Sequence, residues 1–107
     1  MDASEYVRGV LNAYRAAPGT CGAVRKPDRV FAMRLYERGV AMAVVENALV
    51  LACARRLARP ADAVPLAVIR SFAYFSPVID EVLGLGVDDA YFQHLRTRLS
   101  RMLGQPS

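Results

Sequence analysis

The sequence predicts an all-α protein, a compact orthogonal bundle of five to six helices with a central αα-hairpin. Apolar residues recur at intervals of three and four along most of the chain, and no useful length alternates with the period of two that a strand requires. Prolines and glycines divide the chain into segments of helical length. Hydrophobic residues make up 54% of the chain and charged residues 22%, which excludes wholesale disorder. We therefore expect one domain, residues 1–107, with a long loop at 18–27 and a tail at 104–107.

The first helix is predicted between Asp2 and Ala17. Asp2 and Glu5 have the spacing of a capping box, in which side chains satisfy the free amide groups at a helix start. Apolar residues then follow at helical spacing: Tyr6, Val7, Val10, Leu11 and Tyr14. Pro18 and Gly19 end the helix, and the two prolines and two glycines of residues 18–27 predict the longest loop.

Two helices are expected on either side of Gly39. Asp28 would cap a helix over 29–38, which Gly39 ends. The next helix is expected from about Ala41 to Arg59, where Pro60 terminates it. The inward-facing residues of the two helices are predicted to be Val30, Phe31, Leu35, Val45, Leu49, Ala52 and Leu57.

Two further helices are expected around Ser76-Pro77. Pro65 suits the first turn of a helix over 66–75. Ser76-Pro77 either kinks this helix or caps another one, over 78–83, which Gly84 closes.

The last helix is expected over 89–103, with Asp88 as its N-cap. Its apolar residues repeat on one face, which is predicted to pack on the core: Tyr91, Phe92, Leu95, Leu99 and Met102.

Gly39 also has the place of the turn glycine in a helix-turn-helix. Val45 and Leu49 follow it at six and ten residues, the spacing at which a second helix packs on the first. The positions that would meet base edges are Ala41, Met42, Ala43, Glu46 and Asn47, and only Asn47 is a good donor and acceptor for a base. The preferred interpretation is a hairpin in the core that does not read DNA sequence.

Positive charge is concentrated in the first 59 residues, which carry ten basic and five acidic side chains, against four and five in the remainder. Clustered positive charge is all that binding to a nucleic-acid backbone requires. We predict phosphate contacts from Arg55, Arg56, Arg59 and Arg70, and next from Lys26, Arg34 and Arg38. The alternative for residues 55–59 is a solvated helix end that suits the helix dipole. Periodicity alone does not establish that these side chains share one face.

The aromatic stretch over residues 71–75 lies beside the predicted patch. Aromatic rings next to arginines can stack on single-stranded bases, but aromatic residues at helical spacing are more often part of a core. Packing is the preferred interpretation.

No catalytic or cofactor site is expected. The chain has neither a glycine-rich phosphate loop nor a GxSxG motif. Asp80 and Glu81 are neighbours, so on a helix they point about 100° apart and do not form a facing acid pair. Cys21 and Cys53 are expected to be free thiols, and with His94 as the sole histidine a zinc site is not expected.

A cytoplasmic protein without a membrane partner is expected. No apolar run approaches the roughly 20 residues of a membrane-spanning helix. Residues 1–5 lack the basic and apolar regions of a signal peptide.

Several short motifs between Pro27 and Val82 form a further pattern. They are Asp28-Arg29, Leu35-Tyr36, Arg38-Gly39-Val40, Val45-Glu46-x-Ala48-Leu49-x-Leu51-Ala52, Arg55-Arg56 and Ile69-Arg70-Ser71-x-x-Tyr74-Phe75-x-Pro77-Val78-Ile79-Asp80-Glu81. On these motifs the segment resembles small helical proteins encoded beside replication genes of bacterial mobile elements. It also looks like the helical module C-terminal to some primases and plasmid replication proteins. The resemblance implies an accessory role around DNA and no activity of its own, since no catalytic primase motif is present.

The sequence thus favours a non-catalytic accessory protein that binds nucleic acid, chiefly the DNA backbone, in mobile-element replication or transposition. The alternative is a protein-interaction adaptor or a homodimeric helical module without direct nucleic-acid contact. Its docking face toward a second subunit, or toward a replication or transposition enzyme, would hold Met42, Val45, Leu49 and Cys53.

Overall fold

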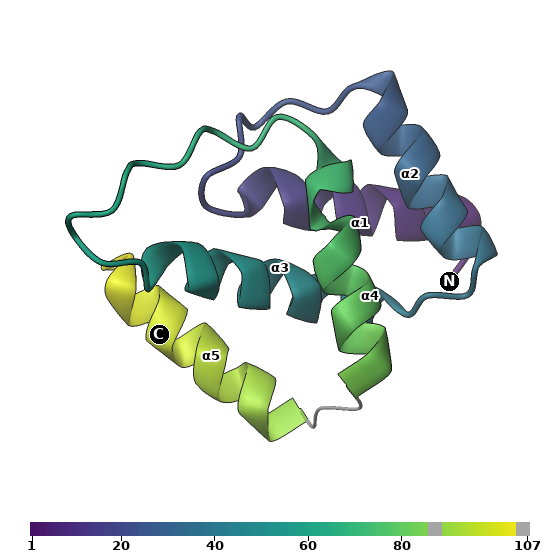
Figure 1. Cartoon of the computed structure of the whole chain (residues 1–107). Coiled ribbons are helices and arrows are strands. Elements are labelled where there is room, and N and C mark those ends of the chain that lie inside the picture. Colours follow the sequence, from purple (N-terminus) through teal and green to yellow (C-terminus); the bar gives the residue numbers. More distant parts are fainter. Residues whose placement is uncertain (86–88, 105–107) are drawn as a thin grey trace.

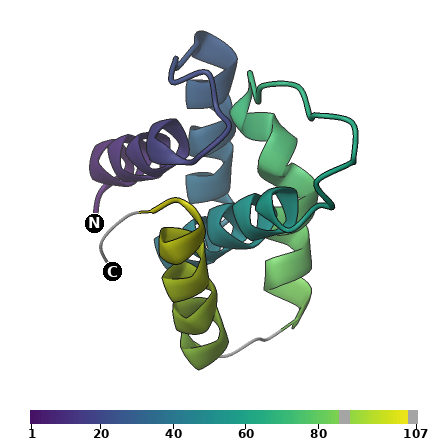
Figure 2. The same ribbon diagram turned by 90° about the vertical axis from the view of Figure 1, so that its left-hand side faces the viewer.

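The all-α prediction is confirmed by the computed structural model, which describes residues 1–85 and 89–104. These residues form five α-helices and one short 3₁₀ helix: α1 (Ala3–Ala16), α2 (Lys26–Glu37), α3 (Met42–Leu57), η1 (Phe72–Phe75), α4 (Ser76–Leu85) and α5 (Asp89–Met102). The helix α3 is central, because it packs against α1, α4 and α5, while α2 packs on α1 (Figure 1). Viewed from the side, the long segment between α3 and η1 loops outward from the bundle (Figure 2). No helix in the described ranges is long and apolar enough to cross a membrane.

The helix α1 begins as predicted. The Asp2 Oδ1 atom accepts a hydrogen bond from the Glu5 amide at 2.8 Å, which satisfies one of the free N–H groups of the first turn. One face of α1 is buried, formed by Tyr6, Val10, Leu11 and Tyr14. The Tyr6 hydroxyl donates to the carbonyl oxygen of Val40 at 2.7 Å, so α1 also holds the turn between α2 and α3.

The start of α2 corrects the prediction. The helix begins at Lys26 rather than Arg29, and Asp28 occupies its third position instead of the N-cap. The Asp28 side chain reaches back, as in a capping box, and its Oδ2 atom accepts from the Arg25 amide at 2.8 Å. Its Oδ1 atom accepts from the Phe72 amide at 2.9 Å, so the buried carboxylate also joins α2 to η1. The buried residues of α2 are Asp28, Ala32 and Leu35, and Val30 points about 200° away from Ala32 on the helix, so it is exposed and not inward as predicted.

The turn at Gly39 separates α2 from α3 as predicted. Gly39 has a φ of 74°, the left-handed conformation that a residue without a β-carbon adopts readily. Beyond it, α3 buries Val45, Leu49 and Ala52. Leu57 was predicted to face inward but is exposed, and it lines the open cavity under the loop that follows α3.

The helix predicted over 66–75 is wrong except for its last turn, η1. Residue Ile69 pairs instead with the loop after α1, where its amide donates to Gly19 O at 2.7 Å and its carbonyl accepts from the Cys21 amide at 2.9 Å. These long-range bonds use the backbone groups that a helix would need for itself. The Ser71 Oγ atom then accepts from the Ala73 amide and caps η1.

The aromatic residues of η1 belong to the core, as the packing interpretation predicted. Phe72 and Phe75 are fully buried. The Phe72 ring stacks on Tyr14 with centroids 5.1 Å apart and meets Phe31 edge-on at 5.0 Å. The side chains of η1 therefore join α1 and α2 at the centre of the fold.

The last two helices partly match their predictions. The helix α4 starts at Ser76, with Pro77 in its first turn where no amide is needed, and it continues past Gly84 to Leu85. In α5, Phe92 and Leu95 are buried, but Tyr91 and Met102 are exposed at the margins of the predicted face. Asp88, the predicted N-cap of this helix, and residues 105–107 of the predicted tail lie outside the described residues.

Candidate nucleic-acid interface

Two of the seven predicted phosphate contacts are held in ion pairs with α4. The Arg38 guanidinium lies 3.3 Å from Asp80 Oδ1. The Arg55 guanidinium makes two hydrogen bonds to the Glu81 carboxylate, one of them 2.8 Å long between Nη1 and Oε2. This contact lowers the pKa of Glu81 and raises that of Arg55, because each charge stabilises the other. Both arginines therefore reach the described surface with their positive charge compensated.

Arg56 is bound to the segment that follows α3. Its Nη2 atom donates to the carbonyl oxygen of Ala67 at 3.0 Å, and its Nη1 atom donates to the Tyr74 hydroxyl at 3.1 Å. The guanidinium also lies over the Tyr74 ring, 5.8 Å from its centroid. Arg56 thus connects the end of α3 to the segment between α3 and η1. Two of its N–H groups are engaged in these hydrogen bonds and are not available to a ligand.

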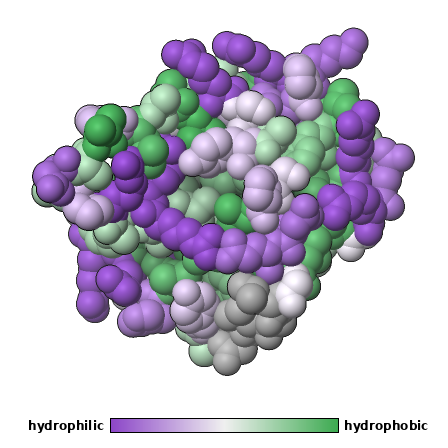
Figure 3. All heavy atoms as spheres, viewed as in Figure 1, coloured by the Kyte–Doolittle hydropathy of each residue, from purple (hydrophilic) through white to green (hydrophobic). Residues whose placement is uncertain are grey.

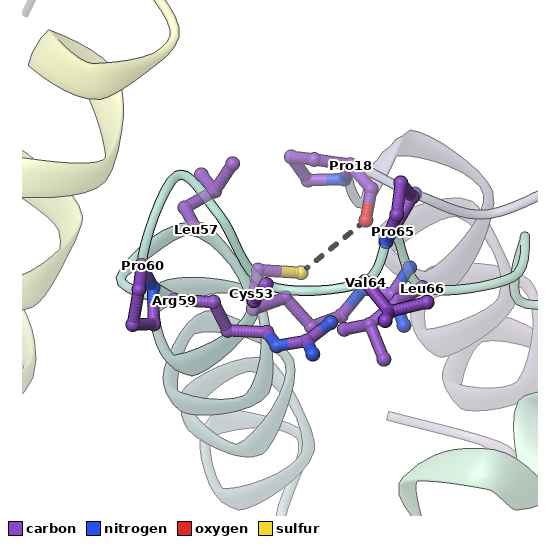
Figure 4. A pocket seen from close by; sticks show the side chains of 11 residues that line it. Pro18, Cys53, Leu57, Arg59, Pro60, Val64, Pro65 and Leu66 are labelled. Carbon is purple, nitrogen blue, oxygen red and sulfur yellow. Dashed lines mark hydrogen bonds between the residues drawn. The ribbon is translucent and has the colours of Figure 1, made fainter.

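A cavity of about 300 Å³ lies under this loop, between Pro18, the end of α3 and residues 60–66. Its lining is mostly aliphatic and proline side chains, among which Arg56 and Arg59 are the charged groups. Figure 4 shows the Cys53 thiol directed at the Pro18 carbonyl oxygen, which it contacts at 3.6 Å. Burial raises the pKa of Cys53, and the nearby Arg56 charge offsets this only in part. Cys53 is thus a buried structural thiol rather than a nucleophile.

Thiol labelling checks this assignment. Cys21 is exposed and Cys53 is buried, so iodoacetamide is expected to alkylate Cys53 about tenfold or more slowly than Cys21 in the folded protein. Mass spectrometry after timed quenching measures both rates, with the urea-unfolded protein as the control in which they converge. Equal rates in the folded protein would show that the thiol at position 53 is accessible.

The other predicted contacts are exposed but do not form one patch. Lys26 and Arg34 lie on α2, Arg59 follows α3, and Arg70 precedes η1. None of these four side chains makes an ion pair or hydrogen bond within the described residues. The helix α2 and the C-terminal end of α3 lie on opposite sides of the molecule in Figure 1. Figure 3 likewise shows hydrophilic side chains on the left, upper and right margins of this face, with apolar areas between them.

The helix α3 does not present the predicted base-reading residue at the surface. Asn47, the one good base-reading residue in the predicted set, is buried, and its Oδ1 atom accepts a hydrogen bond from Arg96 Nη2 at 2.6 Å. Packing on α1, α4 and α5 covers α3 on several sides. The core role that the sequence favoured for this helix is therefore the one observed.

The docking face predicted for the adaptor alternative is also internal. Val45, Leu49 and Cys53 are at most 5% exposed, and Met42 is half-buried. Their apolar surface is covered by the chain's own helices, so it is not available to a partner. This corrects the predicted face because periodicity identifies apolar residues without showing what covers them.

A cationic groove that the predicted site residues do not include lies between α1 and α2. Arg8, Arg15 and Arg29 line it, together with apolar side chains. Arg8 and Arg15 are seven residues apart, two helical turns, and this spacing is the sequence signal that places them on one face of α1.

No protein-family model, no curated protein and no solved structure matches the chain. The class of the protein is therefore defined by its fold, an all-α helical bundle.

Proposed function

We propose that the chain is a non-catalytic, cytoplasmic accessory protein that binds nucleic acid, most directly the DNA backbone, in the replication or transposition of a bacterial mobile element. The observation that carries this proposal is uncompensated positive charge. The chain has a net charge of +4, and several acids are already engaged within the fold. Asp28 is buried on backbone amides, and Asp80 and Glu81 are paired. The exposed cations of α2 and of the segment after α3 are left without acidic partners among the described residues.

The ion pairs divide the seven candidate residues into two groups. Lys26, Arg34, Arg59 and Arg70 are exposed and without side-chain partners among the residues described, so they can displace counterions from phosphates. Arg38 and Arg55 would first have to give up Asp80 and Glu81. We therefore assign direct contacts to the first group and a supporting role to the second, with Arg56 between them because it is partly occupied.

Binding of this kind follows charge and not base sequence. Phosphate contacts position a protein on DNA without reading bases. Binding through phosphates requires no recognition helix, and this agrees with the position of α3 in the core.

A pair of matched double variants tests the assignment. K26Q/R34Q and R38Q/R55Q each remove two positive charges, so they change the net charge equally. We expect K26Q/R34Q to reduce the slope of log affinity against log salt by about two, and R38Q/R55Q to leave it nearly unchanged. Fluorescence anisotropy of labelled single-stranded and duplex DNA over a salt series measures the slopes. An equal decrease of the slope in both variants would contradict the assignment of the residues to two groups. No binding of DNA by the wild type at low salt would refute the nucleic-acid proposal.

The adaptor alternative keeps one observation in its favour. Its predicted face is buried, but the groove between α1 and α2 combines apolar and cationic side chains at the surface. Gel filtration with light scattering separates a homodimeric module from a monomer that uses this groove for another protein.

A further inference from the structure

The groove between α1 and α2 combines apolar and cationic side chains. The two helices cross near the N-terminus (Figures 1 and 2) and leave a groove of about 660 Å³ along α1. Its apolar side chains are Val7, Leu11, Val24 and Met33, and Met33 is 39% exposed. Arg8, Arg15 and Arg29 line the same groove, and no acidic residue does. An apolar surface edged by charges of one sign is typical of a docking site.

The three arginines are free to meet a ligand. Their side chains make no ion pair or hydrogen bond with any residue that the structure describes. Arg8 and Arg15 are separated by about 10 Å along α1, and Arg29 reaches the groove from α2. Positive charge therefore flanks the apolar lining from both helices.

The lining distinguishes a peptide from a nucleic acid. A single strand bound in a groove gains much of its affinity from bases stacked on aromatic rings, and this groove is lined by no aromatic side chain. Phosphates and sugars gain nothing from valine, leucine and methionine. An amphipathic helix, by contrast, places apolar residues at intervals of three and four into such a groove and presents acids on its flanks.

We propose that the groove docks an acidic, amphipathic helical segment of a partner protein. Leucine-like side chains of the segment pack on Val7, Leu11 and Met33, and its carboxylates pair with Arg8, Arg15 and Arg29. None of the seven cations assigned to DNA lines the groove, although Lys26 lies one helical turn from Arg29 on α2. The flexible methionine in the lining can adjust to the segment that binds.

Anisotropy with a defined probe tests the proposal. The probe is a fluorescein-labelled synthetic peptide with leucines at i, i+3, i+4 and i+7 and glutamates on the flanking positions, titrated with the full chain. We expect saturable binding that weakens about tenfold or more in R8Q/R15Q, the equivalent of about 1.4 kcal/mol. The variant R98Q/R101Q removes two exposed arginines of α5 that do not line the groove, so it carries the same change in charge and is expected to bind within about twofold of the wild type. M33E, which places a negative charge on the apolar lining, is expected to abolish binding.

Three outcomes would overturn the proposal. They are no saturable binding of the peptide to the wild type, equal weakening in R8Q/R15Q and R98Q/R101Q, and equally tight binding of a peptide with glutamines in place of the glutamates. Circular dichroism melts confirm that each variant is folded.

A parallel titration with labelled oligothymidylate separates this proposal from the proposed function. Loss of DNA affinity in R8Q/R15Q as large as its loss of peptide affinity would assign the groove to nucleic acid and overturn the docking proposal. Peptide binding by a wild type that binds no DNA would support the docking proposal and refute the nucleic-acid function alone.

Discussion

Phe72→Ala is expected to lower the free energy of unfolding by about 3–5 kcal/mol. The Phe72 ring is fully buried, stacks on Tyr14 and meets Phe31 edge-on, so its removal leaves a cavity and two lost aromatic contacts. A small domain has a total stability of about 5–15 kcal/mol, and this single loss is a large fraction of it. Urea unfolding followed by circular dichroism measures the change.

Two further variants keep this test informative. Phe72→Leu retains most of the volume and is expected to lose clearly less stability than the alanine variant, which remains measurable if the alanine variant does not fold. Val64→Ala deletes an apolar side chain that is 79% exposed and should change stability by less than about 0.5 kcal/mol. A loss of less than about 1 kcal/mol in Phe72→Ala would show that η1 is not part of the core.

The second large effect is expected at Asp28. Asp28→Ala removes the acceptors of the Arg25 and Phe72 amides, and the Phe72 amide is left buried without a partner. We expect a loss of about 2–4 kcal/mol, because each unsatisfied buried donor costs about 1–3 kcal/mol. The same unfolding experiment applies, and hydrogen exchange of the Phe72 amide reports directly on the lost bond.

The controls for Asp28 separate hydrogen bonding from charge. Asp62→Ala removes an exposed carboxylate from the outward loop and should leave stability nearly unchanged. Asp28→Asn keeps one acceptor oxygen, so its loss should be smaller than that of the alanine variant. An alanine variant as stable as the wild type would mean that the bond between α2 and η1 contributes nothing.

The contacts of Ile69 and Asp28 explain why the segment before η1 does not form the predicted helix. The helical spacing of residues 66–75 is real, but Ile69 pairs with the loop at residues 19–21 and Asp28 binds the amide at the start of η1. Both partners lie more than 40 residues away in the chain. A local pattern contains no information about competition from such distant groups.

Among the candidate site residues, too, the local sequence does not determine which side chains are paired. The arginines at 38 and 55 lie opposite Asp80 and Glu81 of α4, whereas those at 34 and 59 have no acidic partner among the described residues. Sequence spacing places Arg55 and Arg59 near one another on a helix, yet one is paired and the other is free in the described structure. Their different pairing follows from helix packing.

The features that the sequence by itself determined are local ones. Apolar periodicity, the Asp2 cap and the glycine at 39 depend on groups within a few residues of each other, so the helical class, α1 and the turn between α2 and α3 could be read directly. The start of α2 is local as well, since Asp28 accepts from the Arg25 amide three residues before it. Only the tertiary structure decided the loss of the helix over 66–75, the pairing of Arg38 and Arg55, and the groove between α1 and α2. Each of these depends on two segments that meet only when the helices pack, because burial and charge compensation belong to pairs of surfaces and not to a single stretch of chain.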